Sequence, residues 1–87
     1  MHAHFNRKEA VPPHSGFHFT IVADNGEPVA NSETYPSATN LERGIRDFSV
    51  AALQAIAAEL HVLRPDQDNT QMVSELQQLA GSIKASA

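Results

Sequence analysis

The stretch of sequence that decides the fold spans residues 16–48 and reads GFHFTIVADNGEPVANSETYPSATNLERGIRDF. Apolar side chains stand at every second position from Phe17 to Ala23. A period of two is typical of a strand that buries one face. The segment from Pro28 to Glu33 is predicted to return as its antiparallel partner.

Asn25 and Gly26 separate these two predicted strands. Asn-Gly is the strongest short signal for a two-residue hairpin loop, the type I′ turn, in which both residues have positive φ. The loop predicts two cross-strand pairs: Ile21 with Ala30, and Val22 with Val29.

A long helix is predicted after the corner at Tyr35 and Pro36. The segment from Thr39 to Glu42 fits a capping box, and Ser37 is the alternative N-cap. Apolar residues then follow in steps of three and four, as in one helical stripe: Leu41, Ile45, Phe48, Ala52, Ile56 and Leu60. The strand and this stripe together predict a buried core of six residues: Phe17, Phe19, Ile21, Leu41, Ile45 and Phe48.

Two segments allow alternatives. Residues 2–8, HAHFNRK, fit either a third strand or a disordered tail. Residues 60–63 fit either the last turn of the long helix or a strand exchanged with another unit. Helix is favoured there because only Val62 is β-branched, and Pro65 then stops it.

A second helix is predicted from Thr70 to Lys84, with Asp68 or Asn69 as its cap. Its apolar side chains form one stripe: Met72, Leu76, Leu79 and Ile83. The stripe suits packing on its own domain, a contact between two copies of the chain, or both.

The motifs of residues 16–48 occur in an order that resembles the YegP-like family of small domains of unknown function. The resemblance rests on thirteen positions: Phe17, Phe19, Ile21, Ala23, Asn25, Gly26, Glu27, Ser32, Glu33, Tyr35, Ser37, Gly44 and Ile45. It implies a unit of three antiparallel strands, a helix and a last strand. Two units, in tandem or from two chains, then build one continuous sheet. The family carries no settled biochemical activity.

The fold class that follows is α+β: a three-stranded antiparallel sheet packed by one long helix, with an additional C-terminal helix. The YegP-like β-β-β-α unit is assigned to residues 1–66 and the C-terminal amphipathic helix to residues 67–87. The chain holds one copy of the motif, so two chains are expected to share one continuous sheet. It departs from the family by a longer helix and by the residues at three outward strand positions: His18, Thr20 and Val22.

Composition narrows the function. The chain of 87 residues has no cysteine and a net charge of −4, which excludes disulfides and argues against a general nucleic-acid or anionic-membrane surface. No apolar run approaches the length of a membrane span, and the N-terminus lacks a signal-peptide layout. We expect a cytoplasmic protein that needs no cofactor.

Candidate catalytic or metal-binding residues are few. Four histidines, His2, His4, His14 and His18, cluster near the N-terminus, but we expect solvated side chains rather than a metal site. No nucleophile and base have triad-like spacing, and Tyr35 is expected to be a packed corner residue. The chain is therefore predicted not to be an enzyme.

The expected function is that of a small homodimeric protein-protein interaction or inhibitor module. The residues proposed for its interfaces lie on the outward strand face and on the second helix: His18, Thr20, Val22, Met72, Leu76, Leu79 and Ile83. The alternative is a nucleic-acid accessory protein that uses four basic side chains: Arg7, Lys8, Arg43 and Arg46.

Overall fold

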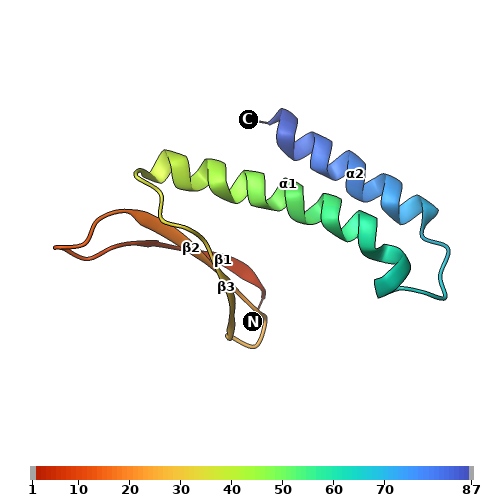
Figure 1. Cartoon of the computed structure of the whole chain (residues 1–87), viewed down its shortest axis with the longest axis horizontal. Coiled ribbons are helices and arrows are strands. Elements are labelled where there is room, and N and C mark those ends of the chain that lie inside the picture. Colours follow the sequence, from red (N-terminus) through yellow and green to blue (C-terminus); the bar gives the residue numbers. More distant parts are fainter. Residues whose placement is uncertain (1, 87) are drawn as a thin grey trace. The chain divides into compact units, whose positions relative to one another are not determined.

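The computed structural model describes residues 2–86 and confirms the α+β class (Figure 1). The elements are, in chain order, β1 (His4–Glu9), β2 (Phe17–Val22), β3 (Pro28–Asn31), α1 (Ala38–Leu63) and α2 (Thr70–Ala85). The chain divides into two compact units, and the boundary between them falls inside α1, between Arg43 and Gly44. Each unit is described separately below.

The first unit holds an antiparallel sheet in the order β1-β2-β3, so β2 is its central strand. The segment HAHFNRK contributes to strand β1, which settles its alternative assignments in favour of a strand. β1 pairs along its whole length with β2; Phe5 faces Ile21 and Lys8 faces His18. Because side chains alternate across a sheet, these two pairs lie on opposite faces.

The inner face of this sheet carries the core of the first unit. Phe19 is 4% exposed, and its ring meets Phe5 edge-on at 5.5 Å and Tyr35 in a stacked arrangement at 6.5 Å. Leu41, near the start of α1, is also buried. Of the six predicted core residues, Phe19, Leu41 and Ile45 are buried, and Phe17 and Ile21 are half-buried. Phe48 was placed wrongly, because 41% of it is exposed.

The turn between β2 and β3 differs from the type I′ prediction. Within residues 2–86, positive φ occurs only at Gly16 and Gly26, so Asn25 does not have it. Gly26 N–H donates to the carbonyl of Ala23, and Ala23 N–H donates to the carbonyl of Glu27. The loop therefore has three residues and ends in a left-handed glycine, the type I turn with a G1 bulge.

The longer loop changes the strand register near the turn. Ile21 pairs with Ala30 as predicted, but Val22 pairs with Pro28 instead of Val29. The register shift between these pairs leaves Val29 as an extra, 63% exposed residue. An Asn-Gly pair is compatible with both loops, because a glycine in the left-handed region is common to them.

Beyond β3, the chain continues beside β2 as far as Tyr35. Ser32 N–H donates to the carbonyl of Phe19, and Ser32 Oγ accepts a hydrogen bond of 2.8 Å from Phe19 N–H. Phe17 and Tyr35 then exchange two backbone hydrogen bonds. Gly16, at φ +111°, lies close to Thr34 of this segment: a Cβ on residue 16 would come 2.4 Å from Thr34 Cγ2. Ser32 and Tyr35 of the motif therefore both bond this segment to β2.

The long helix α1 begins at Ala38, and Ser37 is its N-cap. Ser37 Oγ accepts a hydrogen bond of 3.1 Å from Asn40 N–H, so the capping box assigned to Thr39 was wrong. The helix runs through residues 60–63 and ends at Leu63, which confirms the helical alternative there.

The second unit contains the rest of α1 and α2, which runs back alongside it (Figure 1). Asp68 Oδ1 accepts hydrogen bonds from the N–H and the hydroxyl of Thr70, at the start of α2. Asn69 Nδ2 donates to the carbonyls of Leu60 and Arg64, each at 3.2 Å. Leu60 lies in the last turn of α1 and Arg64 directly follows the helix; the two carbonyls also accept backbone hydrogen bonds from Arg64 N–H and Gln67 N–H. Asn69 therefore ties the two helices together.

Candidate functional site

In the second unit, the two helices present matching buried stripes. In both helices, four buried or half-buried apolar residues are spaced by three, four and three positions: Val50, Leu53, Ala57 and Leu60 in α1, and Val73, Leu76, Ala80 and Ile83 in α2. Ala80, at 2% exposed, is the most deeply buried of them. This spacing is typical of two helices that pack along one seam.

The residues proposed for the α2 interface therefore fall into two groups. Leu76 and Ile83 lie in the seam and are half-buried. Met72 and Leu79 lie beside it and are 38% and 50% exposed. The sequence reading omitted Val73 and Ala80, although both continue the three-four spacing that runs through Leu76 and Ile83.

Four large apolar residues form what we call the apolar side of the helix pair: Ile56, Leu63, Met72 and Leu79. Ile56, Met72 and Leu79 each stand one position before a seam residue, and Leu63 stands three positions after the seam residue Leu60. These two spacings point to the same side of a helix. Because the two helices are antiparallel, that side is also the same side of the seam. Ile56 is 41% and Leu63 is 61% exposed. Arg64 Nη1 donates to Met72 Sδ at 3.0 Å, which places Met72 beside the end of α1.

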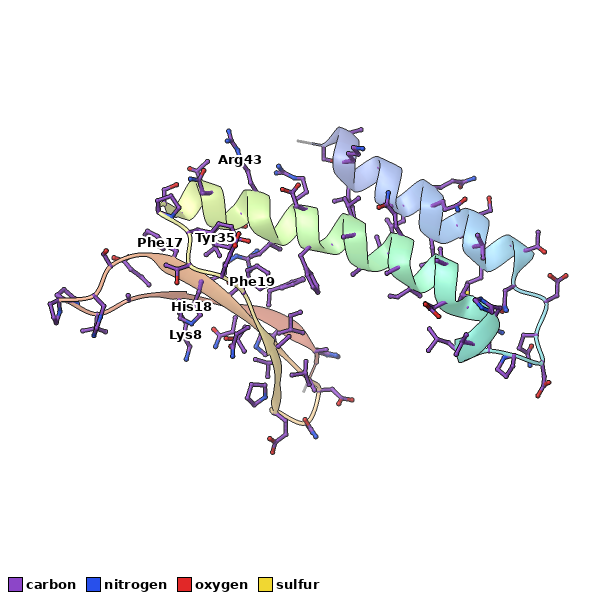
Figure 2. The ribbon with its side chains drawn as sticks, in the orientation of Figure 1. Lys8, Phe17, His18, Phe19, Tyr35 and Arg43 are labelled. Atoms are coloured by element: carbon purple, nitrogen blue, oxygen red, sulfur yellow. The ribbon has the colours of Figure 1, made fainter. Side chains whose placement is uncertain are left out.

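A second surface is the outer face of the sheet in the first unit. His18, Thr20 and Val22 share this face, as predicted from their alternation. They are less exposed than an open strand face implies, since Thr20 is buried and the other two are half-buried. Thr20 Oγ1 donates a hydrogen bond of 2.8 Å to Asn31 Oδ1 on β3. Figure 2 shows Lys8 and His18 extending from the sheet on one side, opposite to Phe17 and Tyr35.

The inner side of the same unit holds an ion pair. Arg7 Nε lies 2.5 Å from Glu42 Oε2, and Arg7 Nη2 lies 3.0 Å from Glu42 Oε1. The hydrogen bond to Glu42 raises the pKa of Arg7 above its ordinary value. Arg7 is thus engaged within the fold, whereas the nucleic-acid alternative needs it as a free cation.

The histidines are dispersed over several elements. His4 Nδ1 contacts the carbonyl of His2 at 2.9 Å, and His18 stands in β2. Within residues 2–86, the structure has no group of three or more His, Cys, Asp or Glu side chains arranged to hold a metal ion. No helix in this range combines the length and apolarity that a membrane crossing requires.

The geometry thus defines a small α+β fold. Residues 15–57 match the model of a family described as a domain of unknown function, DUF1508. This part of the chain is a YegP-like domain of unknown function. The search of curated proteins and the search of solved structures gave no match.

Proposed function

We propose that this protein is a non-enzymatic homodimeric interaction module and that two copies associate through the apolar side of the helix pair. The observation that carries the proposal is the exposure of Ile56, Leu63, Met72 and Leu79 on one side of the seam. Burying such side chains stabilises an association by roughly 25 cal/mol per Å² of apolar surface removed from water.

A second copy of the chain is the occupant that fits best. The same four residues on each protomer would meet across a two-fold axis, which requires only that one surface be self-complementary. Two helix pairs packed in this way form a four-helix bundle, a common arrangement for antiparallel helices joined by a short connection. The chain also carries a single match to the family, and the family resemblance implies two units per assembly.

Size-exclusion chromatography with light scattering tests the proposal on the full chain. We expect a mass of twice 9.4 kDa. Leu79→Glu should shift the mass to that of the monomer, because it buries a charge in the interface. Val29→Glu, at a more exposed position on β3, is the matched control and should leave the dimer intact. Circular dichroism verifies that both variants are folded.

The proposal fails if the wild-type chain is monomeric at high concentration, or if Val29→Glu and Leu79→Glu dissociate the dimer equally.

A gel shift with increasing salt addresses the nucleic-acid alternative, since contacts to phosphates make binding fall steeply with salt concentration. Partners other than a second copy are sought by comparing proteins recovered with tagged wild-type chain and with tagged Leu79→Glu.

A further inference from the structure

The outer face of the sheet is hollowed into a depression of about 420 Å³. We call it the outer depression, and eight residues line it: Asn6, Lys8, His18, Thr20, Val22, Gly26, Pro28 and Asn31. Its volume lies within the range of small-molecule sites, about 300–1,000 Å³. None of the eight is acidic, although the chain has ten Asp and Glu against six Lys and Arg.

Two nitrogen-bearing side chains line the outer depression from paired positions on β1 and β2. Lys8 and His18 are direct partners on neighbouring strands, and side chains at such positions have Cβ atoms about 4.5–5.5 Å apart. In the part of the chain that the structure describes, neither side chain forms an ion pair. An anion between them can accept hydrogen bonds from the ammonium of Lys8 and from a ring N–H of His18.

The outer depression is also lined by side chains with neutral hydrogen-bond donors. Thr20 Oγ1 donates to Asn31 Oδ1, so the amide oxygen of Asn31 faces Thr20 and its NH₂ group is directed elsewhere. Thr20 is only 9% exposed, which holds this arrangement in place. Asn6 faces Thr20 from β1 and adds a second amide. Hydrogen bonds from charged donors to carboxylate or phosphate oxygens are stronger than those between neutral groups.

We propose that the outer depression binds a small ligand through an oxyanion group, either a carboxylate or a phosphate. Lys8 supplies the charged contact, His18 supplies a ring N–H, and Asn31 supplies an amide donor. Val22 and Pro28 provide an apolar wall for the rest of the ligand.

Amide chemical shifts of the full chain, followed by NMR during titration with inorganic phosphate and, separately, with succinate, test this site. We expect saturable shifts at the amides of the outer depression, in at least one of the two titrations. Lys8→Gln should weaken binding at least about tenfold, since it removes a charge-assisted hydrogen bond. Lys84→Gln removes the same charge from α2 and should leave binding unchanged.

The stronger of the two titrations identifies the oxyanion as phosphate or carboxylate. Three results overturn the proposal: no saturable shift with either probe, equal shifts with chloride at matched ionic strength, or equal weakening by Lys8→Gln and Lys84→Gln. His18→Asn provides a second test, because it keeps an N–H donor but removes the imidazole ring. Unchanged circular dichroism verifies that each variant is folded.

Discussion

Arg7 on β1 and Glu42 near the start of α1 form a two-pronged ion pair across 35 positions of sequence. Both side chains are about half exposed, at 48% and 50%. Solvent screens such a pair, so its stabilisation is modest even though the geometry is favourable.

We expect a double-mutant cycle with Arg7→Gln and Glu42→Gln to give a coupling energy of about 0.2–1 kcal/mol, measured by urea unfolding. The hydrogen bond to Glu42 raises the pKa of Arg7 above its ordinary value in the folded state. A raised pKa means that the contribution is fully present below the unfolded value and is lost only at still higher pH. The coupling should therefore be constant around neutral pH and weaken with salt; a marked change near neutrality would contradict this account.

Phe19→Ala should destabilise the first unit by about 3–5 kcal/mol, because it empties a packed aromatic position. The loss involves the ring contacts with Phe5 and Tyr35. Thermal unfolding followed by circular dichroism measures it. Since the variant is expected to unfold at room temperature, Phe19→Leu serves as the milder change. Val29→Ala, at an exposed position, should alter stability by less than about 0.5 kcal/mol.

Gly26→Val should cost more than about 1 kcal/mol, because a β-branched residue resists the left-handed region. Gly26 has φ of +87°. Gly26→Asn is the matched comparison, since asparagine tolerates positive φ better than other non-glycine residues. Equal melting temperatures for the Val and Asn variants would show that backbone conformation does not determine the effect.

Asn69→Ala should destabilise the helix pair by about 1–3 kcal/mol, because the carbonyls of Leu60 and Arg64 each lose the side-chain hydrogen bond that links the two helices. Asn69→Asp has almost the same shape but no amide donor, so it should be at least as destabilising. Urea unfolding is the measurement, with Gln67→Ala as control. If Asn69→Asp is as stable as the wild type, the hydrogen bonds donated by Asn69 Nδ2 do not stabilise the helix pair.

Asp68 provides an acid-dependent contribution to stability. Hydrogen bonds from the N–H and the hydroxyl of Thr70 lower the pKa of Asp68 below 3.8. A lowered pKa means that the stabilisation is present above the unfolded value and is lost as pH falls through the folded one. The melting temperature of the wild type should exceed that of Asp68→Asn at neutral pH, and the difference should shrink below pH 3.8. Asp66→Asn is the control in the same loop.

Strong local patterns predicted the elements well. Alternation identified β2, and the steps of three and four identified both helices, because each pattern buries one face of its element. The assignment of residues 2–8 needed tertiary information, since β1 is held by pairing along β2 rather than by its own alternation. The N-cap illustrates the same limit: both Ser37 and Thr39 have a capping hydroxyl, and only the path of the chain through Tyr35 selects Ser37.

The candidate surfaces were predicted in part. Period two placed His18, Thr20 and Val22 on one face, but their neighbours across the strands, Lys8 and Asn31, depend on the register. The loop of three residues altered the register only beyond Ile21, where Val22 pairs with Pro28, and Asn-Gly alone does not distinguish the two loop lengths. On α2, the pattern detected the apolar residues but did not separate the seam from the exposed side, because the stripe is wider than one contact.

The order β1-β2-β3 pairs only strands that are neighbours in sequence. The loops closed by folding are therefore short, which lowers the chain entropy lost before the strand contacts form. Domains of this kind fold faster than sheets that join distant segments. We expect the meander to assemble quickly from the unfolded chain, without waiting for residues that follow the long helix.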